Sequence, residues 1–238
     1  TAPPTSATTS PAAVPTHTRP SRSTAGLLAP AGSASVQPVM PALGADAAIR
    51  LGRIASLRGD PETAAGWFAA AIAEPDADRG AVGDASGALG DLHRQAGRFD
   101  EAERAYAAAV DGLGPNHEGG DRLVLGLLNL AILALERGDP PGARRFLAAI
   151  GETCGTAPRS CDPLVDVTTA GCAAELGDWD EAAARLIRLD RSVGDPVVWQ
   201  PDTVWVLARC RDRALAAARS AVADHADRLA REVRRRLG

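Results

Sequence analysis

A glycine that recurs at nearly regular spacing restricts the fold of this chain more than any other feature of its sequence. Gly59, Gly97, Gly138 and Gly177 are separated by 38, 41 and 39 residues. In each copy, a small residue lies seven positions before the glycine, an alanine five positions after it and a larger apolar residue nine positions after it. The intervening residues are rich in Ala and Leu, which are strong helix formers. The pattern therefore predicts consecutive pairs of helices, each pair joined at a glycine.

The residue types at these positions suit two closely packed antiparallel helices. The small residue and the alanine let the two backbones approach each other, and the larger apolar residue fills the space beside them. The glycine adopts the left-handed conformation in which a helix commonly ends. The small and larger residues of the four copies are Gly52 with Phe68, Gly90 with Tyr106, Ala131 with Leu147, and Ala170 with Leu186.

This arrangement of residues resembles the tetratricopeptide repeat, and residues 89–109 match it best. The resemblance covers roughly residues 46–190. Residues 113–117, followed by 128–131, are similar to the longer repeats of kinesin light chains. The resemblance implies an all-α protein: a right-handed α-solenoid of about four helix-turn-helix repeats, followed by a C-terminal capping helix or hairpin.

The two ends of the chain differ from the repeats. Residues 1–44 are rich in Pro, Ala, Ser and Thr, and no acidic residue occurs from Thr1 to Pro41, so we expect a disordered stalk or linker. Residues 45–238 form the predicted helical repeat domain. Within it, residues 202–237 contain neither Gly nor Pro and fit either one long helix or a helical hairpin. Because the sequence starts at Thr1 and not at Met, we expect a segment upstream of it.

The distribution of charge argues against nucleic acid as the partner. The net charge is −4, and residues 45–210 hold 16 arginines against 26 acidic residues. Residues 211–238 reverse this balance, with eight arginines against four acidic residues. This basic end could cap the last helix or make peripheral contact with an acidic partner or anionic lipid. No apolar run approaches the roughly 20 residues that a membrane span needs.

Two of the four cysteines are candidates for a disulfide. Cys154 and Cys161 enclose a short segment with a proline, between the third and fourth repeats. Cys172 and Cys210 lie at matching positions of neighbouring helices, where packing distances make a bridge less favourable. A Cys154–Cys161 bond would favour an oxidising, extracytoplasmic location, as does the composition of residues 1–44.

The sequence contains no pattern typical of catalysis. It has no Gly-rich phosphate loop, no Gly-x-Ser-x-Gly elbow and no His or Cys pairs at metal-binding spacing, so we predict no catalytic residue, metal or cofactor. Acidic pairs at the starts of second helices are explained by the helix dipole, and Asp60 and Asp139, each followed by proline, are predicted to cap helices.

The resemblance implies that the first helices of the repeats line a concave groove that binds protein or peptide. The polar residues predicted to face it are Arg50, Arg53, Asp91, Arg94 and Asn129. Asn129 corresponds to a groove asparagine of kinesin-light-chain-like repeats. The leading hypothesis is an exported, non-catalytic scaffold that holds a polypeptide segment. The alternative is a regulatory or oligomerisation module of a larger cytosolic regulator.

Overall fold

The computed structural model describes residues 44–113, 120–154, 161–193 and 199–238, except the side chains of residues 153 and 154. Within these ranges all regular secondary structure is helical. The predicted stalk lies outside the described residues apart from Gly44. The helices are α1 (Ala45–Leu57), α2 (Pro61–Ala73), α3 (Arg79–Gln95), α4 (Phe99–Leu113), α5 (Gly120–Glu136), α6 (Pro140–Cys154), α7 (Asp162–Leu176), α8 (Trp179–Ser192), α9 (Pro201–Ala216) and α10 (Ser220–Leu237).

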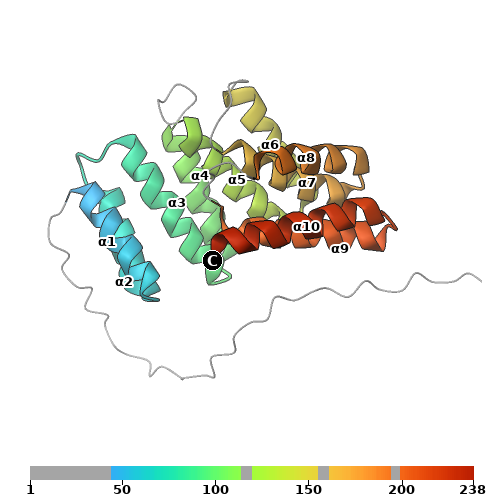
Figure 1. Ribbon diagram of the computed structural model, residues 1–238. Helices are drawn as coiled ribbons and strands as arrows, with labels where there is room; N and C mark the ends of the chain where they lie inside the picture. Colours follow the sequence, from blue (N-terminus) through green and yellow to red (C-terminus); the bar gives the residue numbers. More distant parts are fainter. Residues whose placement is uncertain (1–43, 114–119, 155–160, 194–198) are drawn as a thin grey trace, which may run out of the picture. The chain divides into compact units, whose positions relative to one another are not determined.

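The helices follow one another as antiparallel pairs (Figure 1). The odd-numbered helix of each pair packs against the even-numbered helix that follows it. Each odd-numbered helix also contacts the next odd-numbered helix, so α1, α3, α5, α7 and α9 form one continuous row. This arrangement confirms the predicted all-α solenoid of four repeats, and α9 and α10 form the C-terminal hairpin. None of the described helices combines the length and the apolar character needed to cross a bilayer.

The turn glycines end the first helices as predicted. Gly59, Gly97, Gly138 and Gly177 all have φ between 73° and 77°, the left-handed region that disfavours residues with a Cβ atom. The N–H of the next residue donates to the carbonyl five positions earlier in each turn, which is the hydrogen bond of a Schellman motif. The repeated glycine therefore sets the direction in which each second helix departs.

Aspartates directly after these turns begin the second helices. The Asp60 carboxylate accepts a hydrogen bond from the Thr63 N–H at 3.1 Å, and the Asp139 carboxylate accepts one from the Gly142 N–H at 2.9 Å. Each aspartate precedes a proline in the first turn, where the missing N–H has no cost. Both predicted caps are confirmed.

The close approach within each pair is clearest between α3 and α4. A Cβ atom on Gly90 would lie 2.5 Å from Cε1 of Tyr106, whose side chain is completely buried. Gly52 and Phe68 make the same contact between α1 and α2. The alanines five positions after the turn glycines are also fully buried: Ala64, Ala102, Ala143 and Ala182. Packing of one large side chain over one small residue therefore holds the early pairs together.

The last pair keeps this geometry with different residues. Ala218 takes the turn position with φ 56°, and the Arg219 N–H donates to the Ala214 carbonyl at 2.8 Å. Arg211 and Asp227 lie seven before and nine after this turn, where the other pairs place their small and large residues. They form an ion pair, with Arg211 Nη1 3.3 Å from Asp227 Oδ1.

The predicted Cys154–Cys161 disulfide is not formed. Cys161 is a buried free thiol at the start of α7, and its sulfur lies 3.7 Å from Oδ1 of Asp121 on α5. The side chain of Cys154 lies outside the described part. Cys172 and Cys210 are also buried free thiols, and the Cys172 thiol donates to the Pro140 carbonyl at 3.3 Å. The Cys161 and Cys172 thiols thus contact oxygen atoms of neighbouring helices.

Candidate functional site

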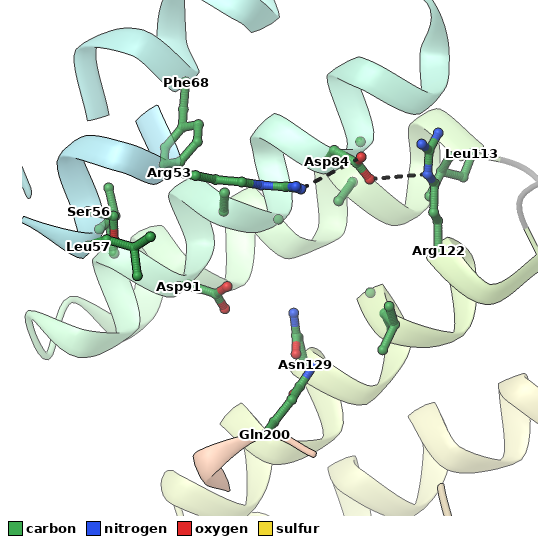
Figure 2. Close-up of a pocket in the computed structure, with 17 residues that line it drawn as sticks. Arg53, Ser56, Leu57, Phe68, Asp84, Asp91, Leu113, Arg122, Asn129 and Gln200 are labelled. Carbon is green, nitrogen blue, oxygen red and sulfur yellow. Dashed lines mark ion pairs between the residues drawn. The ribbon is translucent and has the colours of Figure 1, made fainter. Parts of the chain in front are cut away.

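A groove of about 480 Å³ runs across the first three helices of the odd-numbered row (Figure 2). Its walls come mainly from α1, α3 and α5, with smaller contributions from α2 and α4. Gln200, just before α9, also lines it. The lining mixes charged and amide side chains with apolar ones, including Leu57, which is 89% exposed. Such a surface can bind apolar and polar groups of a ligand at the same time.

Three of the five predicted partner-binding residues meet in this groove. Arg53 comes from α1, Asp91 from α3 and Asn129 from α5, and all three line it (Figure 2). Arg50 is exposed on α1, and Arg94 is largely enclosed near the end of α3, and neither is among the lining residues. Contact of any of the five with a partner stays a prediction.

One carboxylate organises the charges at one end of the groove. Asp84 lies between two arginines: its Oδ2 is 3.9 Å from Arg53 Nη2, and its Oδ1 is 3.3 Å from Arg122 Nε (Figure 2). The arginine side chains are 60% and 47% exposed, whereas Asp84 is 28% exposed. Two accessible guanidinium groups therefore share one carboxylate, so one negative charge faces two positive charges in this cluster.

Asp91 is held in the groove wall by a residue of the second helix. The Tyr106 hydroxyl donates a hydrogen bond of 2.6 Å to Asp91 Oδ1. Burial raises the pKa of Asp91 above the usual range of an aspartate, while the hydrogen bond from Tyr106 works in the opposite direction. The large side chain that locks α3 against α4 thus also orients a polar residue of the groove.

Arg94 is engaged within the chain. It forms an ion pair with Asp202 of α9, and its Nη1 lies 3.2 Å from Oε1 of Glu136 at the end of α5. Its side chain is 11% exposed. Burial opposes its charge, but the hydrogen bond with Asp202 raises the pKa of Arg94, so the guanidinium stays protonated. Arg94 joins three helices of the odd-numbered row.

Sequence reasoning missed several residues of the groove. Asp84 and Arg122 each lie seven positions before a predicted residue, Asp91 and Asn129, and seven residues span about two helical turns. A heptad search from the predicted positions would have found both. Gln200 lies outside the four repeats, and the sequence carries no signal that brings it to the groove.

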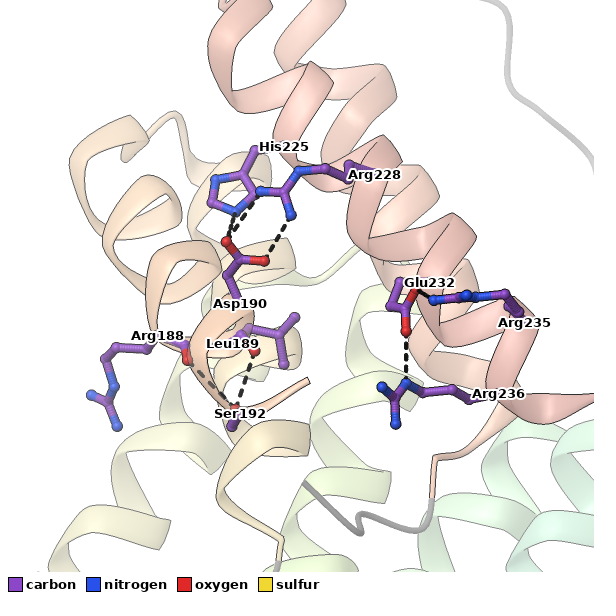
Figure 3. A network of polar contacts seen from close by, with 9 residues as sticks. All are labelled: Arg188, Leu189, Asp190, Ser192, His225, Arg228, Glu232, Arg235 and Arg236. Carbon is purple, nitrogen blue, oxygen red and sulfur yellow. Dashed lines mark hydrogen bonds and ion pairs between the residues drawn. The ribbon is translucent and has the colours of Figure 1, made fainter. Parts of the chain in front are cut away.

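Four arginines of α10 form ion pairs with acidic residues of α8 or of α10 itself. Arg228 Nη1 lies 2.7 Å from Asp190 Oδ1 of α8, and His225 of α10 approaches the same carboxylate (Figure 3). Further ion pairs join Arg231 to Asp227, and Arg235 and Arg236 to Glu232. These contacts favour the interpretation that this end caps the solenoid. No cluster of three or more potential metal ligands occurs among the described residues.

The repeat can now be identified. A family model of the tetratricopeptide repeat matches residues 85–115, which cover the later part of α3 and all of α4. The match thus identifies one tetratricopeptide repeat within this chain. The matched region contains the pair of Gly90 and Tyr106 and the turn at Gly97. The groove lies on the first helices of the first three helix pairs.

Among solved structures, the protein is similar to YrrB, described as a tetratricopeptide repeat protein with an unusual peptide-binding site. The two share 16% sequence identity, the match covers 78% of this chain and 84% of YrrB, and the TM-score is 0.49. No curated protein matches the sequence. The similarity to kinesin light chains stays a prediction.

Proposed function

We propose that the protein is an interaction scaffold that binds a polypeptide segment in the groove of α1, α3 and α5. The observation that carries this proposal is that Arg53, Asp91 and Asn129 line one open surface. They come from α1, α3 and α5, which are neighbours in the odd-numbered row. The tetratricopeptide repeat is a non-catalytic interaction module, which agrees with this role.

The groove chemistry favours an extended segment that carries an acidic side chain. Arg53 and Arg122 are accessible, and both pair with Asp84, so a ligand carboxylate can pair with the outer faces of their guanidinium groups. The Asn129 carboxamide can both donate to and accept from a peptide backbone. The exposed Leu57 offers apolar contact nearby.

Affinity capture with the full chain tests this proposal. Arg53→Ala and Asn129→Ala should each reduce the amount of partner retained from a proteome digest. Arg50→Ala is the matched control, because Arg50 lies three positions away on α1 and does not line the groove. Equal retention by all four proteins would show that partners bind elsewhere.

We also propose that the protein is exported. The composition of residues 1–44, rich in Pro, Ala, Ser and Thr, supports this location. The absence of the Cys154–Cys161 bond removes the second argument that the sequence offered. Fractionation of cells that produce the native protein provides the test, and recovery only from the cytosol would contradict export.

A further inference from the structure

A short segment before α9 reaches the groove from outside the first three repeats. Trp199 is buried in the core cluster that includes side chains of α5 and α7. Gln200 follows with extended backbone, φ −107° and ψ 149°, and Pro201 begins α9. The buried indole ring therefore fixes one side of Gln200.

An ion pair between distant helices fixes the other side. Asp202 pairs with Arg94, 108 positions earlier in the chain, and Arg94 also contacts Glu136. The side chains of Arg94, Glu136 and Asp202 are 11%, 14% and 24% exposed. Solvent therefore screens these contacts less than it screens ion pairs at the open surface. Gln200 is thus held between a buried aromatic ring and a shielded ion pair.

The side chain of Gln200 makes no polar contact with the described part of the protein. It lines the groove next to Asn129 (Figure 2), and in the described ranges it makes no hydrogen bond and does not cap α9. Asn129 likewise has no hydrogen bond from its side chain among the described residues. Two neighbouring carboxamides therefore present free donors and acceptors to the same space.

We infer that Gln200 is a ligand-contacting, specificity-determining residue of the groove, and that Trp199 and Asp202 position it. This inference rests on the proposed function. Each carboxamide supplies an NH2 group that donates and a carbonyl oxygen that accepts, which complements the C=O and N–H groups of an extended peptide main chain. The segment before α9 thereby forms an end wall, and the ligand segment lies along α1, α3 and α5.

A displayed library of random 12-residue peptides, selected on the full chain, provides a probe. The affinity of a selected synthetic peptide is then measured for each variant by fluorescence polarisation. Gln200→Ala should weaken binding about 2- to 12-fold, the range for one hydrogen bond. Gln200→Glu, which loses the donor but keeps the size, should also weaken it. Both should unfold at the wild-type urea midpoint, because the side chain has no partner in the protein.

The positioning contact needs its own comparison. Asp202→Asn should weaken binding of the same peptide, because Asp202 then loses its ion pair with Arg94 and no longer fixes the position of Gln200. Asp212→Asn is the matched control, since Asp212 also lies on α9 but pairs with its neighbour Arg211. It should bind the peptide as tightly as wild type.

The outcomes separate this inference from the proposed function. If no selected peptide depends on Arg53 or Asn129, the proposed groove function is wrong. If peptides depend on those residues but bind Gln200→Ala and Gln200→Glu with wild-type affinity, the groove function stands and the role of Gln200 is refuted.

Discussion

Two glycines of α3 should respond in opposite directions to the same substitution. A Cβ atom on Gly87 would have no atom within 4 Å, apart from its own helix and chain neighbours. A Cβ atom on Gly90, one turn later, would lie 2.5 Å from Cε1 of Tyr106. Helix propensity favours alanine equally at both positions, so a difference in stability between the variants measures packing alone.

The magnitudes follow from these distances. Replacing a glycine inside a helix by alanine stabilises it by about 1 kcal/mol, which should appear in full for Gly87→Ala. The Tyr106 ring is completely buried, and its hydroxyl is hydrogen bonded to Asp91, so the ring cannot turn away freely. Overpacking costs about 1–3 kcal/mol, which should separate Gly90→Ala from Gly87→Ala by that amount. Each kcal/mol corresponds to a change of about 2–4 °C in Tm.

Urea unfolding of the full chain, followed by circular dichroism, measures both variants. Similar m-values would show that the compactness of the unfolded state is unchanged. Gly87 also lines the groove, so its alanine variant should bind a groove ligand more weakly although it is more stable. A loss of stability in Gly87→Ala, or equal stability of the two variants, would refute the packing argument.

Three further predictions concern the turn, the groove and the thiols. Ala218→Gly should raise the free energy of unfolding by about 0.5–1 kcal/mol, since alanine is strained at φ 56°, and a decrease in urea midpoint would contradict this. Burial raises the pKa of Asp91 in the folded protein above the about 3.9 of an unfolded chain. The free energy of unfolding of the wild type therefore increases as pH falls from the folded-state pKa to the unfolded-state pKa. The stability of Asp91→Asn relative to wild type, measured by urea unfolding, should therefore be highest at neutral pH and decline toward pH 4; a constant difference would contradict it. Burial raises the pKa of Cys161 and of Cys210 to about 12, so both thiols should resist a thiol reagent in the folded protein at pH 8. Both should react once the protein is unfolded without reductant. A lower thiol count in the unfolded protein would reveal a disulfide and contradict the prediction.

The helix pairs were predictable because their contacts are local and steric. Gly90 and Tyr106 are 16 residues apart, and the same spacing joins the small and large residues of the other repeats. A close backbone approach admits few residue types, so the constraint leaves a visible pattern in the sequence. The turn glycines are visible for the same reason, because their φ values disfavour other residues.

The groove was predictable only in part, because its residues are not restricted in this way. The faces of α1, α3 and α5 followed from helical periodicity, which brought Arg53, Asp91 and Asn129 to one surface. Arg94 occupies an equally periodic position, but the ion pair with Asp202 draws it into a contact within the chain. Periodicity specifies the face of a helix, whereas contacts across 108 residues decide which side chains on that face remain free.

The fifth pair shows how a fold can persist where its sequence pattern is lost. Ala218 occupies the glycine position at a tolerable cost in backbone strain, and Arg211 with Asp227 replaces the small and large residues. An ion pair at about one-third exposure stabilises little, so it cannot by itself hold α9 to α10. The buried residues Ala223, Ala226, Leu229, Ala230 and Val233 supply the apolar contact on α10. The last pair therefore needs only a solvent-tolerant contact at the position where the earlier pairs need a close steric fit.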